Sequence, residues 1–133
     1  MTIQYSVAVN NARLDAVETA IGVSAVLKIR TGAPPATVAT PDSGSVLATV
    51  NLPSDWMADA AAASKAKAGT WQDASADAPG TAAHFRVYAA DGTTAHIQGT
   101  YGTSGTDMIG DSVSFTAGQS FTINTFTLNG GNQ

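Results

Sequence analysis

Both histidines of the chain lie in one stretch, HFRVYAADGTTAHIQG, at residues 84–99. His84 and His96 are the side chains best suited to acid–base chemistry at neutral pH. A histidine that acts as a base also needs a group that orients its ring, and a zinc site needs a third ligand nearby. In the hairpin that this stretch predicts, no carboxylate falls on the face that carries the two histidines. We therefore expect neither a catalytic residue nor a metal site here.

The register of this hairpin follows from its apolar pattern. A two-residue turn at 91–92 would set Val87 against His96, so that both faces would mix apolar and polar partners. A three-residue loop at 91–93, with its glycine in the left-handed conformation, removes the conflict because it sets Val87 against Ile97. The polar side chains then share the opposite face in the pairs Tyr88–His96, Arg86–Gln98 and His84–Thr100, and we expect that face to be an exposed contact surface.

The acidic and glycine-rich segments give only weak indications of chemistry. Two aspartate pairs, Asp73/Asp77 and Asp107/Asp111, are each spaced four residues apart, whereas calcium loops use several oxygen ligands at alternating positions. We expect these aspartates to cap turns. The glycine-bearing run at 99–110 lacks the lysine of a phosphate-binding loop, and no GxSxG motif is present. The sequence thus predicts no enzyme and no cofactor.

The two tryptophans, Trp56 and Trp71, allow two interpretations. Their rings could stack on a sugar, as in a carbohydrate-binding module, because an indole offers a large apolar face with one polar edge. Alternatively, one or both rings fill the hydrophobic core. The sequence favours the core and leaves the sugar as an alternative.

The composition is that of a small protein with few surface charges. The chain has 133 residues, of which 44% are hydrophobic and 12% charged, and its formal net charge is −4. A surface built from alanine, threonine, serine and glycine suits packing against other protein copies. The six basic residues are scattered, so direct binding to nucleic acid, which needs a clustered basic footprint, is not expected. Cysteine is absent, which excludes disulfides and thiolate ligands.

The sequence indicates neither a membrane span nor a secretion signal. Its apolar runs are all shorter than the ~20 residues that cross a bilayer. The first residues, MTIQYSVAVNN, lack the basic region and the apolar region of a signal peptide. We expect a protein that is made and assembled in the cytoplasm, without a membrane partner.

The N-terminal part of the chain predicts an arm followed by a helix. Residues 3–9 alternate apolar and polar side chains, which is typical of a strand or an extended arm. Asn10-Asn11 are good N-caps for a helix over 11–21, which Gly22 is expected to end. Three helical turns are marginal alone, so this helix must pack on the rest of the chain. The apolar stripe available for that packing consists of Leu14, Val17 and Ile21.

The rest of the chain predicts β-structure. Short alternating runs are separated by loops rich in proline and glycine, a pattern typical of a sandwich, jelly roll or barrel. The alanine-rich segment 54–69 is expected either to form a short helical turn over 55–63 or to be a loop. With the N-terminal run, about eight strands are expected, over residues 3–9, 26–30, 46–52, 67–71, 82–90, 94–101, 111–115 and 120–128.

The predicted fold is all-β: an antiparallel β-sandwich of the jelly-roll type with one N-terminal α-helix. We expect a single domain over residues 1–133, in which residues 1–22 form the arm and the helix and residues 23–133 form the sandwich. In the strand at 26–30, Lys28 and Arg30 are expected to point outward.

Several short phrases of the sequence resemble one group of proteins. NARLDAVETAIG, VLKIRTGAPPA, LPSDWM, KAGTWQDASAD and HFRVYAADGTTAHIQGT are similar, in this order and over nearly the whole chain, to small virion structural proteins of tailed bacteriophages and prophages. Phage proteins of this size that are β-rich, cysteine-free and low in charge look like head decoration or cement proteins, several of which are similar to jelly rolls.

The resemblance implies a capsid decoration or cement protein that binds the outside of the assembled head and stabilises it. The expected partners are the major capsid protein of the phage and further copies of the chain, as a dimer or trimer. The expected location is the outer surface of the virion head, after synthesis in the host cytoplasm. The alternatives are a structural subunit of the phage tail or neck, and a carbohydrate-binding module that aids adsorption. The contact residues expected are Ile3, Tyr5 and Val7 of the arm and Arg86, Tyr88 and His96 of the hairpin.

Overall fold

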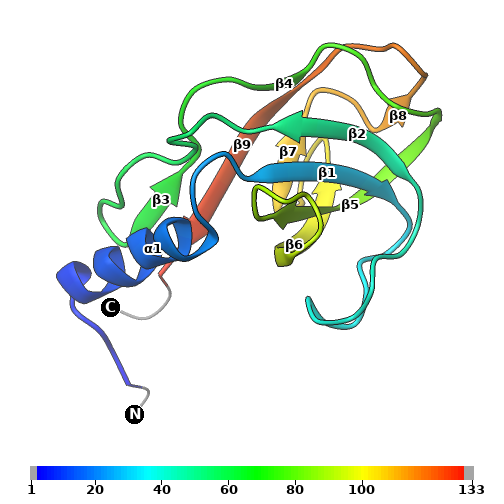
Figure 1. The fold of residues 1–133 in the computed structure, drawn as a ribbon. Coiled ribbons are helices and arrows are strands. Elements are labelled where there is room, and N and C mark those ends of the chain that lie inside the picture. The colour runs from blue at the N-terminus through cyan, green and yellow to red at the C-terminus, as the bar shows by residue number, and fades with distance from the viewer. Residues whose placement is uncertain (1–2, 131–133) are drawn as a thin grey trace.

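Strands make up most of the regular structure, and the helix that the structure describes, α1 (Val7–Ile21), precedes all of them (Figure 1). The structure is a computed structural model that describes residues 3–130. The prediction of a mostly β protein with one N-terminal helix is confirmed. The strands are β1 (Val26–Thr31), β2 (Val46–Asn51), β3 (Ser64–Ala66), β4 (Trp71–Asp73), β5 (Gly80–Tyr88), β6 (Ala95–Gly102), β7 (Met108–Gly110), β8 (Ser114–Phe115) and β9 (Phe121–Asn129).

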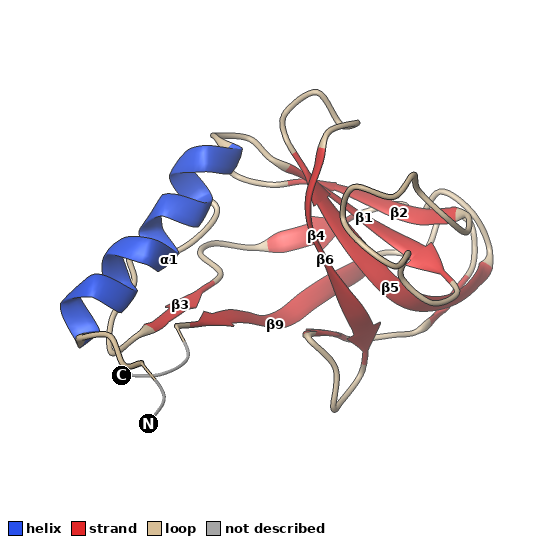
Figure 2. Cartoon of the chain, turned by 90° about the horizontal axis from the view of Figure 1, so that it is seen from below, coloured by secondary structure: helices blue, strands red, loops and turns tan. Residues whose placement is uncertain are grey.

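These strands form one curled sheet in the order β2-β1-β5-β6-β7-β9-β3, with β4 paired to β9 and β8 paired to β5 (Figures 1 and 2). The pairs are antiparallel except for β6 and β7, which run parallel, so the prediction of a purely antiparallel sheet is wrong. Parallel neighbours usually need a crossover of about a dozen residues. Here a short loop, 103–107, suffices, because Asp107 closes it by accepting hydrogen bonds from the backbone N–H and the hydroxyl of Thr100.

The core lies between the two halves of the curled sheet. Phe85 of β5 meets Phe126 of β9 edge to face, with ring centroids 5.4 Å apart, and Phe126 also contacts Trp71 at 5.7 Å. Trp56 and Trp71 are both 0% exposed, and their ring centroids are 6.1 Å apart. Each indole N–H donates to a backbone carbonyl oxygen, as a buried indole requires. The prediction that one or both tryptophans fill the core is confirmed, and both of them do.

The start of the helix differs from the prediction. α1 begins at Val7, and residues 3–9 do not form a strand. Ser6 is the N-cap, because its hydroxyl oxygen accepts a hydrogen bond from the backbone N–H of Val9. Alternating apolar side chains at residues 3–9 fit a strand, but the cap and the continuation into the predicted helix stabilise helical backbone from Val7 onward.

The end of the helix and its packing follow the prediction. α1 ends at Ile21, and Gly22 follows with a φ of 97°, a conformation that favours glycine. Leu14 and Ile21 are buried, and Val17 is partly buried against the core. Within the part of the chain that the structure describes, no helix has the length and the hydropathy needed to cross a membrane.

Residues 54–69 form neither the helical turn over 55–63 nor the strand expected at 67–71. Ala62 and Ala63 have φ angles of 52° and 58°, in the left-handed region that a right-handed helix excludes. Backbone N–H groups of this segment donate to side chains of α1 instead of to helical carbonyl oxygens. The alternative interpretation as a loop is therefore correct for residues 54–63, and the short strand β3 that follows was not predicted.

Candidate protein-binding surface

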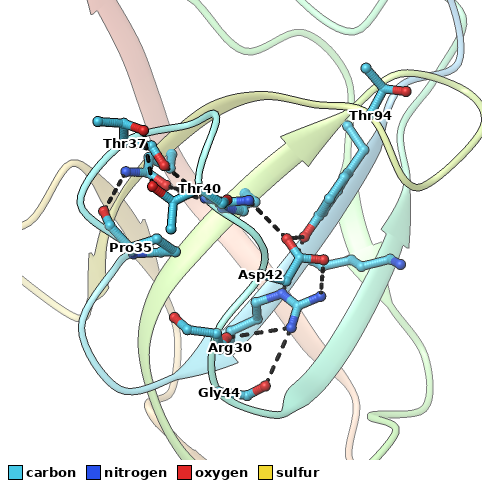
Figure 3. Close-up of polar contacts among 12 residues, drawn as sticks. Arg30, Pro35, Thr37, Thr40, Asp42, Gly44 and Thr94 are labelled. Carbon is cyan, nitrogen blue, oxygen red and sulfur yellow. Dashed lines mark hydrogen bonds and ion pairs between the residues drawn. The ribbon is translucent and has the colours of Figure 1, made fainter.

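The polar face of the β5–β6 hairpin is mostly buried. His84, Arg86 and Tyr88 are each at most 2% exposed, so the prediction that these three side chains form an exposed contact surface is wrong. Of the six residues predicted on this face, His96 and Thr100 are exposed and Gln98 is half-buried. The reason is the loop between β1 and β2, residues 32–45, which folds over this face and covers it (Figure 3).

Asp42 holds this loop in place together with Arg30, which was expected to point outward but is 6% exposed. The Asp42 carboxylate accepts hydrogen bonds from Arg30 and Arg86, both at 2.9 Å, and from the Tyr88 hydroxyl at 2.7 Å (Figure 3). Burial alone would raise the pKa of Asp42, but the Tyr88 hydroxyl and the two guanidinium groups hold it below its ordinary value. The loop is thus tied to β1 and β5 by partly buried, charge-assisted hydrogen bonds.

His84 belongs to the same buried face and is not available as a base. Its Nδ1 lies 2.7 Å from the carbonyl oxygen of Gly32, which assigns the ring proton to Nδ1. Its Nε2 is buried and has no hydrogen-bond partner within residues 3–130. Burial lowers the pKa of His84, and the charges of Arg30 and Arg86 lower it further. The ring therefore stays neutral and covered at neutral pH.

A bulge explains why His96 is separated from the other three residues. The predicted pairs are present from His84–Thr100 to Val87–Ile97, so the predicted register is confirmed over this part of the hairpin. Between Val87 and Tyr88 the register shifts, and Tyr88 faces Ala95 instead of His96. The turn glycine, Gly92, has the predicted left-handed conformation, with a φ of 72°.

A second buried charge, Lys65 of β3, fixes α1 to the sheet. Its side chain is 1% exposed, and its ammonium nitrogen lies 2.7 Å from Asp15 and 3.0 Å from Glu18, both on α1. Burial would lower the pKa of Lys65, but the two carboxylates raise it above its ordinary value. Asn11, Asp15 and Glu18 also accept hydrogen bonds from three backbone N–H groups of residues 57–63. Side chains on one side of α1 thus accept the backbone hydrogen bonds of residues 57–63 that, in a sheet, a neighbouring strand would accept.

Sequence reasoning missed both charge clusters. The clusters join residues that are far apart in the chain: Asp42 and Arg86 are separated by 44 positions, and Asp15 and Lys65 by 50. One local signal was available, because Asn11, Asp15 and Glu18 recur at intervals of four and three residues and therefore share one side of a helix. That spacing indicates a polar contact beside the apolar stripe.

The exposed large hydrophobic side chains of residues 3–130 all belong to the N-terminal segment. They are Ile3 (75% exposed), Tyr5 (43%), Val7 (43%), Val9 (45%) and Val23 (67%). The first three are the arm residues predicted to make contacts, although Val7 lies in the first turn of α1. Figure 2 shows α1 beside the sheet, with one long side facing away from it. This segment is the best candidate for binding another protein, since it carries the exposed large apolar side chains of residues 3–130.

A pocket of about 530 Å³ lies along one side of α1, between the helix, β6 and the end of β9. Apolar side chains line it, including Val17 and Ile97, and Arg13 and His96 border it. The Arg13 guanidinium also lies over the ring of Tyr5, 4.6 Å from its centroid. The structure therefore brings Tyr5 and His96, from two separate predicted contact regions, to one surface. We call the side of the helix that carries Arg13 the basic flank.

The opposite side of α1 is acidic. A second pocket, of about 400 Å³, is lined by residues that include Glu18, Val23 and Asp55. A hydrogen bond shared with Glu18, and the negative charge of that group, raise the pKa of Asp55 above its ordinary value. Asp15 lies one helical turn before Glu18 on this side. We call Asp15, Glu18 and Asp55 the acidic flank.

Three of the four aspartates considered as calcium ligands act as hydrogen-bond acceptors. Asp73 and Asp77 accept from the backbone N–H and the hydroxyl of Thr49, and Asp107 closes the loop after β6. Within the described residues, no group of three or more histidine, aspartate or glutamate side chains could hold a metal ion.

Comparisons with protein-family models, with curated proteins and with solved structures found no match to the chain. Its function is therefore inferred from its residues and their geometry.

Proposed function

We propose that the protein is a decoration or cement protein of a phage head, which binds the outside of the assembled shell through its N-terminal segment. One observation carries this proposal: every exposed large hydrophobic side chain of residues 3–130 lies in the segment from Ile3 to Val23. A monomer that worked alone would gain nothing from such a surface, whereas a protein that binds a larger assembly needs one. The short phrases that resemble phage virion proteins support the same assignment.

The stabilising effect would come from preferential binding to the assembled shell. A ligand that binds the assembled state and not its separate parts shifts the equilibrium toward assembly by mass action. The partner in this proposal is the major capsid protein, and the contact residues are Ile3, Tyr5 and Val7, which are all exposed. Arg86 and Tyr88 drop out of the contact surface because they are buried, whereas His96 stays in it.

The finer description of the fold, a jelly-roll sandwich, also belongs to this proposal. It is supported by the packing of the two halves of the curled sheet, in which Phe85 of β5 contacts Phe126 of β9. The carbohydrate-binding alternative loses its support, because Trp56 and Trp71 are both 0% exposed and offer no ring face to a sugar.

The arm can be tested by changing its three residues together. The triple variant Ile3→Ser, Tyr5→Ser, Val7→Ser loses apolar contacts that each contribute about 1 kcal/mol to binding. We therefore expect it to bind about 100-fold more weakly than the wild type to virions that lack the protein. Ser104→Ala, in an exposed loop, is the control and should bind as the wild type does. Co-sedimentation with purified virions measures both. Equal binding of the triple variant and the control would refute the assigned contact surface.

The function itself is tested on particles made with and without the protein. Particles that lack it should release their DNA at a lower temperature and under a weaker osmotic shock. Equal resistance of the two kinds of particle would contradict a cement role. Antibody labelling of intact virions separates the head from the tail or neck, because a head protein labels the whole shell and a tail or neck subunit labels one vertex or the tail.

A further inference from the structure

α1 is apolar on two opposite sides, although only one of them packs on the sheet. The inward side carries the buried Leu14 and Ile21. A surface helix normally carries charged or polar residues on its outward side. The outward side of α1 instead carries an uncharged row, which we call the outward seam. It consists of Val9, Ala12, Ala16 and Thr19, all of them exposed.

The spacing of the outward seam is that of a contact between helices. Its residues follow one another at intervals of three, four and three, which is the heptad spacing that faces a partner helix in a coiled coil. Ala12 and Ala16, in the middle, allow close approach, since the distance between packed helices depends on the side chains at the contact. The fitting partner is therefore another helix, and a second copy of the chain supplies one with the same seam.

The charges beside the outward seam select the orientation of the paired helices. The basic flank and the acidic flank lie on its two sides. In an antiparallel pair related by a two-fold axis, like flanks would face each other, and like charges repel. In a parallel arrangement, the basic flank of one copy faces the acidic flank of the next. Only the parallel arrangement makes the charges complementary.

We propose that the outward seam binds the outward seam of further copies of this chain, with the α1 helices parallel, in a closed cyclic oligomer. The uncharged seam supplies the apolar contact, and the two flanks set the direction. Arg13 of each copy then lies beside the acidic flank of its neighbour, and the same contact repeats around the ring.

The role of this oligomer rests on the proposed function, to which it adds a way for several arms to bind the shell together. Parallel helices bring the arms of all copies to the same end of the ring. Several copies of Ile3, Tyr5 and Val7 would then contact the shell together, and linked contacts bind much more tightly than single ones.

The strength of the contact follows from its size. A 15-residue helix is about 22 Å long, whereas a stable interface buries about 800 Å² on each partner. We therefore expect assembly in solution between micromolar and millimolar protein.

Sedimentation equilibrium of the full chain over this concentration range measures the assembly. Ala16→Glu places a charge in the middle of the outward seam and keeps a good helix former, and it should weaken association by at least about 100-fold. Thr116→Glu adds the same charge at an exposed position away from α1 and should assemble as the wild type does. Circular dichroism confirms that both variants are folded. A wild-type chain that stays monomeric at millimolar concentration, or equal assembly of Ala16→Glu, would overturn the proposal.

The orientation is tested by cross-linking, which is clean because the chain has no cysteine. In parallel helices, equal positions lie side by side, so Val9→Cys alone and Thr19→Cys alone should each form a disulfide-linked dimer under a mild oxidant. In antiparallel helices, Val9 of one copy lies near Thr19 of the other. Cross-linking only in a mixture of the two variants would therefore refute the parallel arrangement.

The inference and the proposed function can fail separately. If the chain assembles through the outward seam but does not bind virions, the proposed function is wrong and the oligomer stands. If it binds virions but stays monomeric, the oligomer is wrong and the proposed function stands. When both hold, Ala16→Glu should bind virions weakly as a monomer, whereas the triple arm variant should assemble but not bind.

Discussion

Two charge clusters hold the two segments that pack against the sheet, the loop 32–45 and α1, and their charges are reversed. Around Asp42, one carboxylate is shared by two guanidinium groups, which fixes the loop 32–45. Around Lys65, one ammonium group is shared by two carboxylates, which fixes α1. The shared group differs in burial: Asp42 is 37% exposed at its side chain, whereas Lys65 is 1% exposed.

The comparison shows that the loss of stability on removing the shared group depends on how buried the remaining charged groups are. Without Asp42, Arg30 and Arg86 would stay in the interior, where their side chains are 8% and 2% exposed. Without Lys65, Asp15 and Glu18 would remain, and their side chains are 46% and 18% exposed. Water can solvate the two carboxylates but not the two guanidinium groups, and an uncompensated buried charge is strongly destabilising.

The largest effect is expected for Asp42→Ala. It should lower the free energy of unfolding by about 3 kcal/mol, since two buried guanidinium groups lose their carboxylate. Urea denaturation measures the loss, and amide hydrogen exchange should accelerate in residues 32–45 but not in α1. Asp42→Asn keeps the shape and should lose nearly as much, because an amide nitrogen cannot accept a hydrogen bond. A variant Asp42→Asn as stable as the wild type would show that shape, not charge, holds the loop.

A smaller effect, about 2 kcal/mol, is expected for Lys65→Met. The methionine fills the volume of the lysine stem, and the hydrogen bonds from the backbone of residues 57–63 to α1 remain. Hydrogen exchange should now accelerate in α1 and not in the loop 32–45, which reverses the pattern expected for Asp42→Ala. If Lys65→Met proved more destabilising than Asp42→Ala, burial of the remaining charges would not be what ranks the two clusters.

The smallest effect concerns mild acid, which should act on the Asp42 cluster through His84. His84 lies in that cluster, and its pKa is lowered from an unfolded value of 6.5. A group with a lowered pKa in the folded state contributes stability that is present above the unfolded pKa and is lost as the pH falls toward the folded value. Stability should therefore decrease from pH 7 to pH 5. Asp42 and Asp15 add to the loss only below their ordinary pKa of 3.8.

Two single variants isolate this contribution. His84→Gln should flatten the dependence of the unfolding free energy on pH between 7 and 5, measured by urea denaturation at each pH. His96→Gln changes the exposed histidine and should keep the slope of the wild type. An unchanged slope in His84→Gln would exclude His84 as its cause.

The sequence predicted the features that depend on neighbouring residues. The end of α1, its inward stripe and the register from His84 to Val87 all follow from spacing within one or two elements. The burial of Arg86 could not be predicted in this way, because it depends on a loop that is about 45 residues away in the chain. An alternating strand shows which side chains share a face, but it does not show whether another segment covers that face.

The start of α1 and the parallel pair failed for a similar reason. The alternation of residues 3–9 fits a strand, but the Ser6 hydroxyl caps a helix by accepting a hydrogen bond from the backbone N–H of Val9. The parallel pairing of β6 with β7 is accompanied by hydrogen bonds between Asp107 and Thr100. The alternation of apolar and polar residues does not predict these bonds. The exposure of the candidate contact residues Ile3, Tyr5 and Val7 agrees with the prediction, while their role in binding stays a prediction.

The side chains that anchor α1 also protect the sheet from uncontrolled growth. β2 and β3 end the strand order, and an open strand edge invites pairing with another chain. The segment that leads into β3 donates backbone hydrogen bonds to Asn11, Asp15 and Glu18 of α1. On β2, the backbone N–H of Thr49 donates to the Asp73 carboxylate, and the carbonyl oxygen of Leu47 accepts a hydrogen bond from the N–H of Asp77. Both edges are thus partly occupied by the chain's own groups. Many copies can therefore crowd onto one surface without fusing their sheets into a fibre.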